Sequence, residues 1–404
     1  MTDRPLHVLV APDSFKGSLS SVDVAQALAD GWRTARPRDE LTLGPLADGG
    51  EGTLEAVAAA GGWDWLPAHT EDPLGRPIDG SFLRQENRAI VELATASGLS
   101  RVTEAERDPM AASTFGTGLI MAAAITLGCR HVVLGLGGSA TTDGGSGLLR
   151  ALGVRFLDER GEELPPGGGP LGKLAVADVS GLSPLLREVS LTIASDVTNA
   201  LCGELGAAAT YGPQKGASEA AVRLLDANLA HYADVLELAT GHDVRTEPGA
   251  GAAGGTTAGL LAIADRFASF AIRPGVELVM ELTDFHQRLE ACDVVLTGEG
   301  RIDEQTAHGK TALGVARRAE EAGKPCIAFG GGVTVVGADG LATLRTVAVP
   351  VVESPMTVAE AVAAGTAPVA RAAERAARLI NIGAGTRGGA LGGAADSRGD
   401  TDRG

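Results

Sequence analysis

Short apolar runs alternate along the chain with longer amphipathic stretches. The first run, His7–Ala11, precedes a helical pattern over Ser20–Thr34. A second run near Leu41–Pro45 leads into a helix predicted at Thr53–Ala60. Because glycine-rich or polar turns join the strands to the helices, this repeat is typical of a parallel α/β sheet with right-handed crossovers.

The pattern changes between residues 63 and 95, where shorter alternating runs and turns predict antiparallel hairpins. The strand–helix rhythm then returns, with strands predicted at His131–Leu136 and Val189–Ala194. Another apolar run, Val294–Leu296, predicts a buried strand, and a long helix near Pro368–Ile380 closes the pattern. The chain therefore combines parallel α/β segments with a stretch of antiparallel sheet.

Composition is typical of a soluble globular protein, with 44% apolar and 21% charged residues, and 404 residues suffice for about two domains. No run of about 20 apolar residues is present, and the start of the chain does not resemble a signal peptide. The four cysteines are widely spaced, which favours free thiols in a reducing compartment. These features predict a cytoplasmic protein with no membrane partner.

The net charge of −17 argues against non-specific nucleic-acid binding, and no basic recognition helix is evident. The histidines form no metal-ligand cluster, so a transition-metal site is not expected. An anionic substrate would have to be bound by local basic groups, because the overall charge opposes it.

The most informative stretch is Asp293–Lys310. Its apolar run is followed at once by Glu299, Arg301 and Asp303, among glycines that let the backbone turn and approach a ligand. We expect these ionisable residues to follow the strand at its carboxyl end, where open α/β sheets bind their ligands.

Similar polar junctions recur along the chain. They are Asp13-Ser14-Phe15-Lys16, Asp48-Gly49-Gly50-Glu51, Gly135–Gly147, Asp196 with Asn199, the turn Tyr211–Gly216 that contains Lys215, and Pro248–Gly255. Singly, the first two can also be read as helix capping and a glycine turn. As a set they suit phosphoryl transfer, which uses cations and backbone amides for phosphates and carboxylates for Mg²⁺ and the proton.

Common phosphate-binding patterns fail in detail. Gly167–Lys173 has P-loop spacing but lacks the Ser or Thr that must follow, and Gly309-Lys310-Thr311 lacks the first glycine. Gly249–Gly254 fits G-x-G-x-x-G, yet no strand precedes it, so glycine amides forming an anion nest are the preferred interpretation. No G-x-S-x-G elbow is present, which disfavours acyl transfer.

Together these junctions resemble the glycerate kinase family of the bacterial type, the glycerate 2-kinase group. The resemblance runs from about residue 6 to 380 and is carried by Ala11–Ser18, Pro45–Gly52, Gly135–Gly147, Tyr211–Ala217, Pro248–Gly255 and Leu296–Asp303. Tyr-Gly-Pro-Gln-Lys-Gly and Thr-Gly-Glu-Gly-Arg-Ile-Asp are its most specific strings. One departure is Ala200, which stands where the family usually has proline after the equivalent of Asn199.

The resemblance implies ATP-dependent phosphorylation of D-glycerate to 2-phosphoglycerate with Mg²⁺, by a monomer or homodimer. It also implies a discontinuous Rossmann-like α/β domain, residues 1–85 with 288–382, and an inserted α/β domain with a mixed sheet, residues 86–287. The substrates would bind in the cleft between them. Residues 383–404 lack apolar periodicity and are predicted to be a disordered tail.

Residue chemistry within this resemblance gives provisional roles. Asp196 would orient or deprotonate the attacking hydroxyl, and Lys16 or Arg301 would bind the glycerate carboxylate. Asp48, Glu299 and Asp303 would hold Mg²⁺ or substrate hydroxyls. Further substrate-binding candidates are Asp13, Ser14 and Asn199. The candidates for ATP and its phosphates are Gly137, Gly138, Ser139, Thr141, Lys215, Gly251, Gly254 and Lys310.

Two kinds of alternative stay open at this point. If the chain is a kinase, the alternatives are that its product is 3-phosphoglycerate or that its substrate is another small hydroxy acid. In another class, the chain is a non-catalytic sensor of an anionic metabolite, although the DNA-binding element that a transcriptional sensor needs is not apparent.

Overall fold

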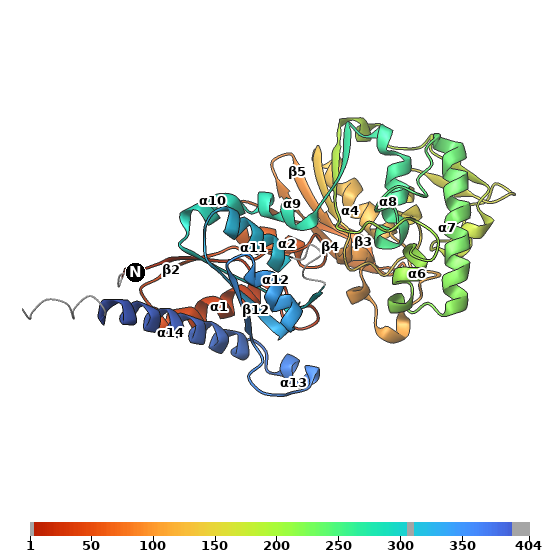
Figure 1. Ribbon diagram of the computed structural model, residues 1–404. Coiled ribbons are helices and arrows are strands. Elements are labelled where there is room, and N and C mark those ends of the chain that lie inside the picture. Colours follow the sequence, from red (N-terminus) through yellow and green to blue (C-terminus); the bar gives the residue numbers. More distant parts are fainter. Residues whose placement is uncertain (1–3, 305–310, 390–404) are drawn as a thin grey trace, which may run out of the picture. The chain divides into compact units, whose positions relative to one another are not determined.

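The computed structural model describes residues 4–304 and 311–389 (Figure 1). Contacts divide the chain into two compact units, and the chain leaves the first and later returns to it. The first unit is Met1–Pro45 with Phe285–Gly404, and the second is Leu46–Asp284.

The first unit has a five-stranded, fully parallel sheet in the order β13-β12-β11-β1-β2. Its strands are β1 (His7–Val10), β2 (Glu40–Leu43), β11 (Val294–Ile302), β12 (Cys326–Val333) and β13 (Thr346–Pro350). Its helices are α1 (Ser21–Ala35), α10 (Phe285–Ala291), α11 (Thr311–Glu321), α12 (Val335–Ala342), α13 (Val358–Ala363) and α14 (Ala367–Gly389).

Helices cover both faces of this sheet. Val10, Leu296 and Phe329 belong to one apolar cluster with α1 and α14, which run side by side in Figure 1. Ala328, the neighbour of Phe329, belongs to a separate cluster with residues of α11 and α12. Adjacent strand residues therefore face opposite layers, as the pleat requires.

Two elements of the first unit extend beyond their predicted ends. Strand β11 continues to Ile302, so Glu299 and Arg301 lie on the strand and not after it. They pair with Gly330 and Gly332 of β12, and this distant partner keeps the polar segment extended. Helix α14 continues to Gly389, into the predicted tail, and residues 390–404 lie outside the described residues.

The second unit has a six-stranded mixed sheet in the order β10-β9-β6-β5-β4-β3, and a two-stranded sheet of β7 and β8. Its strands are β3 (Asp64–Glu71), β4 (Pro77–Gln85), β5 (Arg88–Glu92), β6 (His131–Gly135), β7 (Arg155–Leu157), β8 (Val176–Asp178), β9 (Ser190–Ala194) and β10 (Ser269–Arg273). Its α-helices are α2 (Thr53–Ala60), α3 (Ala94–Ser97), α4 (Phe115–Thr126), α5 (Ser146–Ala151), α6 (Ala207–Tyr211), α7 (Glu219–Thr240), α8 (Ala252–Ala262) and α9 (Gly275–Leu282).

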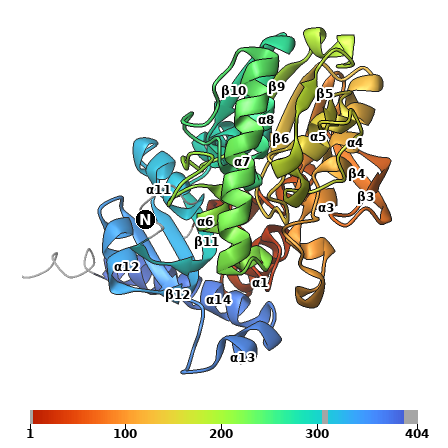
Figure 2. The ribbon, with the colours of Figure 1, turned by 90° about the vertical axis from the view of Figure 1, so that its right-hand side faces the viewer.

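Strands β5, β6, β9 and β10 are parallel, whereas β3 and β4 pair antiparallel with each other and with β5. One large apolar core joins this sheet to the surrounding helices. Tyr232 of the long helix α7, seen lengthwise in Figure 2, packs against Phe156 with ring centroids 5.8 Å apart. The parallel sheet of the discontinuous part and the mixed sheet of the inserted part confirm the predicted fold class.

The boundary between the units differs from the predicted domain boundary at residue 85. Residues 46–85 belong to the second unit, because β3 and β4 are hydrogen-bonded through β5 to its sheet. The return to the first unit occurs at Phe285, close to the predicted residue 288.

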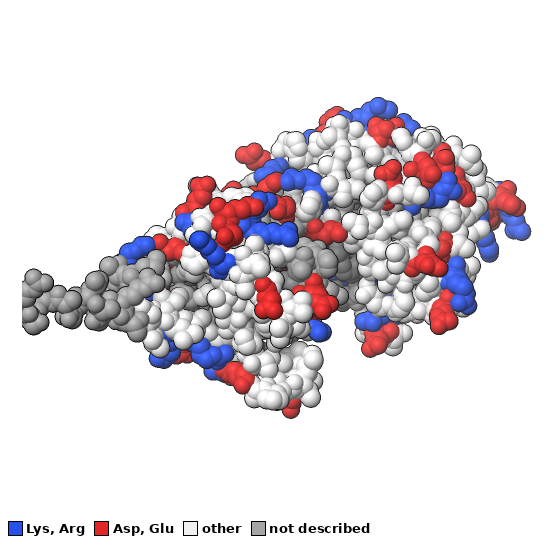
Figure 3. Space-filling model, viewed as in Figure 1, with Lys and Arg blue, Asp and Glu red and all other residues white. Residues whose placement is uncertain are grey.

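In residues 4–304 and 311–389, no helix is long and apolar enough to cross a membrane. On the face shown in Figure 3, acidic and basic side chains are interspersed, and no broad basic area is visible.

Candidate functional site

In the second unit, four parallel strands end at one edge of the sheet and deliver polar groups there. Glu92 ends β5, the glycine turn at Gly137 follows β6, Asp196 follows β9 and Gly275 follows β10. This arrangement is the one expected for ligand binding at the carboxyl ends of parallel strands.

The loop that carries Asp48 lies against this edge with backbone-to-backbone contacts. A Cβ atom on Gly275 would stand 1.9 Å from the Asp48 carbonyl oxygen. Similarly, a Cβ on Gly137 would stand 2.3 Å from the Gly50 Cα. Glycine is needed at both positions because any side chain would push the loop away. The Asp48 side chain accepts a hydrogen bond from the Gly50 N–H at 3.0 Å, which fixes its own turn.

Asp196 has the electrostatic surroundings of a proton acceptor. Its side chain reaches solvent, yet partial burial raises its pKa to about 6. A hydrogen bond from the Gly275 N–H opposes this rise, while the negative charges of Asp48 and Glu277 add to it. The structure thus brings the predicted Asp48 and Asp196 together and adds Glu277, which the sequence analysis did not single out.

Glu92 is a second residue that the sequence analysis missed. It is 5% exposed, and its carboxylate accepts the Gly52 N–H at 3.3 Å and the Leu54 N–H at 3.1 Å, at the start of α2. Glu92 therefore anchors the end of the Asp48–Gly52 loop to the sheet edge. The one sequence signal was an acidic residue directly after the apolar run Ala89–Val91.

Burial raises the pKa of Glu92 to about 8, and the charges of Glu55 and Glu51 add to the rise, whereas the two N–H donors oppose it. The folded protein then binds a proton that the unfolded chain, with an ordinary glutamate pKa near 4.5, has already lost. The stability from this group is complete below pH 4.5 and is lost as the pH rises through 8.

We therefore expect Glu92→Gln to flatten the fall of stability between pH 6 and 8. The free energy of unfolding, measured by chemical denaturation, should differ between the variant and the wild type by an amount that changes by up to about 1.4 kcal/mol per pH unit. Glu159→Gln, at an exposed turn, is the matched control and should follow the wild type. Parallel curves for Glu92→Gln and wild type would show that Glu92 does not carry this proton.

The turn after β6 presents two backbone donors. Leu99 N donates to Gly138 O at 2.8 Å and Ala140 N to Ser97 O at 2.9 Å, which hold the turn from one side. Within the described part of the chain, the N–H groups of Gly138 and Ser139 have no hydrogen-bond acceptor. Two adjacent amides of this kind can bind an anion.

The buried side chain of Lys215 binds the same turn from the protein interior. It is 2% exposed, and its ammonium donates to Ser139 Oγ at 2.9 Å and to Thr141 O at 2.6 Å. Burial lowers its pKa to about 7, and the charge of Asp143 acts the other way. The structure brings Lys215, Ser139 and Thr141 together, but the ammonium faces the protein interior.

Three other predicted residues serve the packing of loops in the second unit. Asn199 donates through Nδ2 to Leu205 O at 2.7 Å and accepts from the Tyr211 hydroxyl at 3.0 Å. Gly251 donates its N–H to Asn199 O at 2.9 Å. At Gly254, φ is +66° and a Cβ would stand 2.0 Å from Thr141 O, so only glycine fits.

In the first unit, the residues after β1 lie against the carboxyl half of β11. Thr297 donates to Ala11 O at 2.8 Å, and Asp13 N donates to Gly298 O at 2.8 Å. Asp13 is 6% exposed and accepts from Ser14 N at 2.6 Å and from the Thr311 hydroxyl at 2.5 Å. Asp13 is therefore well placed to fix the turn that presents Ser14.

The remaining predicted residues of this unit differ in exposure. Lys16 and Arg301 are exposed, and Arg301 Nε lies 3.1 Å from an Asp303 carboxylate oxygen. Glu299 is 6% exposed on β11. Lys310 lies outside the described residues.

A divalent cation was expected among Asp48, Glu299 and Asp303. Nowhere in residues 4–304 and 311–389 do three or more His, Cys, Asp or Glu side chains group as a metal site would require. Asp48 belongs to the second unit and the other two to the first. Within the described residues, neither unit by itself therefore groups enough ligands for a complete protein cage, although carboxylate oxygens are the donor type that Mg²⁺ prefers.

Comparisons with known proteins identify the family of the chain. The family model described as the glycerate kinase family matches residues 8–381. The glycerate kinase of Halalkalibacterium halodurans is 45% identical over 326 residues, covering 80% of this chain and 85% of that protein. The glycerate 2-kinase of Escherichia coli K12 is 43% identical over 331 residues, covering 81% and 86% respectively.

A solved structure shares the fold over nearly the whole length. The crystal structure of a candidate glycerate kinase 2 from Salmonella typhimurium LT2 matches with a TM-score of 0.79 and 37% identity, covering 94% of this chain and 99% of that one. Such coverage includes both units and the edges described above. The protein is a kinase, and its chain belongs to the glycerate kinase family.

Proposed function

We propose that this kinase transfers the γ-phosphoryl group of ATP to the 2-hydroxyl of D-glycerate, giving 2-phosphoglycerate and ADP. The names of its relatives support glycerate as the substrate, and the name of the Escherichia coli relative supports the 2-position. The chemistry is supported most directly by one observation, the carboxylate of Asp196 beside Asp48 at the carboxyl edge of the mixed sheet.

Asp196 would accept the proton of the attacking hydroxyl. With a pKa of about 6 it is largely ionised at neutral pH, yet it is more basic than an ordinary aspartate. The Gly275 N–H would orient the Asp196 carboxylate, and the negative charges of Asp48 and Glu277 would raise its affinity for a proton.

The glycine turn would bind a phosphate of ATP through the N–H groups of Gly138 and Ser139. Lys215 would act indirectly, because its ammonium already holds Ser139 and Thr141. We likewise assign Gly251 and Gly254 to shaping the neighbouring loops and not to direct phosphate contact.

The exposed cations of the first unit, Lys16 and Arg301, would bind the glycerate carboxylate. This proposal requires substrates that contact both units, as in an interdomain cleft. It is supported by the chain connection, since the link at Pro45–Leu46 immediately precedes Asp48. Mg²⁺ would be held by Asp48, Glu299 or Asp303 together with phosphate oxygens, and it would neutralise phosphate charge.

We also propose that the enzyme works in the cytoplasm. The reaction consumes ATP, and all four cysteines are free, as is usual in a reducing compartment. Cell fractionation with an antibody against the chain tests this location.

A coupled ADP-release assay tests the substrate. With D-glycerate, tartronate and lactate offered separately with Mg-ATP, we expect kcat/KM to be at least about tenfold higher for D-glycerate, because only it offers both hydroxyls and the carboxylate. A preference for another hydroxy acid, or ADP release that no acceptor stimulates, would contradict the proposal.

A further inference from the structure

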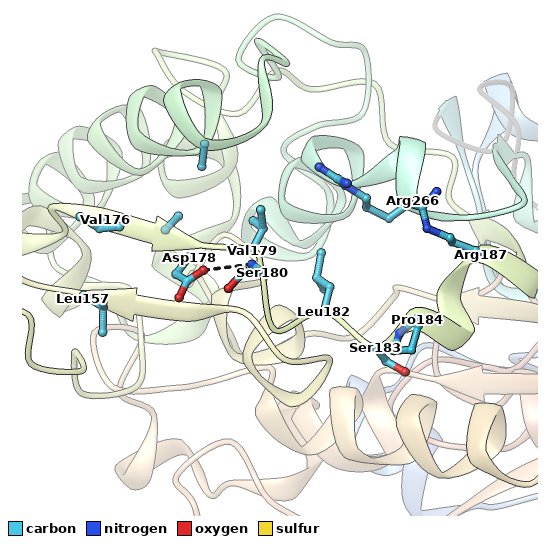
Figure 4. A pocket seen from close by; sticks show the side chains of 12 residues that line it. Leu157, Val176, Asp178, Val179, Ser180, Leu182, Ser183, Pro184, Arg187 and Arg266 are labelled. Carbon is cyan, nitrogen blue, oxygen red and sulfur yellow. Dashed lines mark hydrogen bonds between the residues drawn. The ribbon is translucent and has the colours of Figure 1, made fainter.

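The second unit contains a cavity of about 610 Å³ that the proposed reaction does not use (Figure 4). It is bounded by the two-stranded sheet of β7 and β8, by the loop that follows β8, and by two short 3-10 helices, η4 (Pro184–Glu188) and η6 (Ala264–Arg266). Its volume lies within the range of small-molecule sites.

The cavity is apolar along one side and basic at one end. Val176, Val179 and Leu182 supply aliphatic surface, and Val176 leaves 49% of its area exposed. In Figure 4, Arg187 and Arg266 lie at the opposite end from Asp178. Asp178 accepts the Ser180 N–H at 3.0 Å, so its carboxylate is engaged within its own loop.

Both arginines retain donors for a ligand. Arg266 is partly exposed. Its buried Nε lies 3.4 Å from the adjacent Asp265 carboxylate, so the terminal nitrogens of its guanidinium are the donors that a ligand would reach. The Arg187 guanidinium is exposed and makes no hydrogen bond or ion pair within residues 4–304 and 311–389. Guanidinium groups carry N–H donors that match a carboxylate in geometry and charge, so this end of the cavity favours an anionic group.

The cavity lies at the other end of the strands that carry the candidate active site. Arg187 precedes β9 by three residues and Arg266 precedes β10 by three residues. Asp196 and Gly275 follow the carboxyl ends of the same two strands, each five residues long and hence roughly 17 Å. A ligand in the cavity would therefore be separate from the reacting groups.

We propose that this cavity binds a small carboxylate with a short aliphatic body. The carboxylate contacts Arg187 and Arg266, and the aliphatic body lies along Val176, Val179 and Leu182. This inference does not depend on the proposed substrate, because none of these residues belongs to the edge that holds Asp196.

Calorimetric titration of the full-length protein with butyrate and hexanoate tests the site. D-Glycerate is left out, because it is itself a small carboxylate that would compete at Arg187 and Arg266. The arginine variants distinguish this cavity from any carboxylate site at the edge that holds Asp196. We expect one saturable site, with hexanoate bound roughly tenfold more tightly than butyrate because of its two additional methylene groups. Arg187→Ala should weaken hexanoate at least about tenfold through loss of a charged hydrogen bond.

Arg266→Ala should have a similar effect, and Arg160→Ala, at an exposed turn outside the cavity lining, should leave binding unchanged. If Arg266→Ala fails to fold, the exposed Arg187 still decides the test. The proposal is overturned if no saturable binding occurs, if chain length has no effect, if inorganic phosphate binds as tightly as hexanoate, or if Arg187→Ala binds hexanoate like the wild type. Kinase activity is not the readout, so a wrong substrate assignment would be detected separately.

Discussion

Asp196→Asn is expected to lower kcat for D-glycerate phosphorylation by roughly 10²–10⁴-fold, the usual contribution of a general base. Asparagine keeps the size of the side chain and an oxygen that can accept the Gly275 N–H, so the local geometry should persist. What is lost is the ability to take up a proton. The measurement is steady-state ADP release at saturating substrates.

The matched control is Asp64→Asn, an exposed aspartate at the start of β3, which should keep wild-type turnover. Thermal melting of both variants checks that the fold is retained. Since the pKa of Asp196 is about 6, wild-type kcat/KM should fall as the pH drops below 6 and the carboxylate becomes protonated. Near-wild-type turnover of Asp196→Asn would sink the assignment of Asp196 as base.

Gly275→Ala is expected to cost roughly 100-fold in kcat, because misplacement of reacting groups by about 1 Å has effects of that size. The new Cβ would stand 1.9 Å from the Asp48 carbonyl oxygen and 3.0 Å from Gly49 N. Both are backbone atoms, so the Asp48 loop must move away from the sheet edge. The same glycine donates its N–H to Asp196, so the position of the Asp48 carboxylate relative to the Asp196 carboxylate changes.

Gly340→Ala provides the control for this substitution. Gly340 lies within α12, and a Cβ there meets no atom within 4 Å. Alanine should therefore preserve activity and stabilise the helix by about 0.5–1 kcal/mol. If Gly275→Ala also kept full activity, the close contact between Gly275 and Asp48 would have no part in catalysis.

Local patterns predicted most elements of the fold. The helix predicted at Thr53–Ala60 has those bounds, and Ser20, where the first helical pattern begins, accepts the Asp23 N–H as N-cap of α1. Capping and periodicity depend on residues a few positions apart, so the sequence contains them directly. The strand β11 was predicted too short, because its polar half is held extended by Gly330 and Gly332 of β12, about 30 positions away.

In the candidate site, too, some residues could be predicted from local sequence, and others depend on distant parts of the chain. Asp48 and Asp196 were identified because each follows an apolar run. Their strands, β2 and β9, belong to different sheets, and the close backbone contacts at Gly137 and Gly275 bring the Asp48 loop to the edge that holds Asp196. Glu92 was missed because its role depends on a helix start some 40 positions earlier in the chain. The burial of Lys215 was not predictable either, since lysine in a glycine-rich turn is usually exposed and only the tertiary structure covers it.

The most direct test of the proposed function is phosphorus NMR of the product formed from D-glycerate and Mg-ATP by the purified protein. We predict one new phosphomonoester signal that matches authentic 2-phosphoglycerate and grows as ADP appears. Asp196→Asn protein at equal concentration should produce this signal far more slowly. A signal matching 3-phosphoglycerate, or ATP consumption with only inorganic phosphate as product, would contradict the proposal.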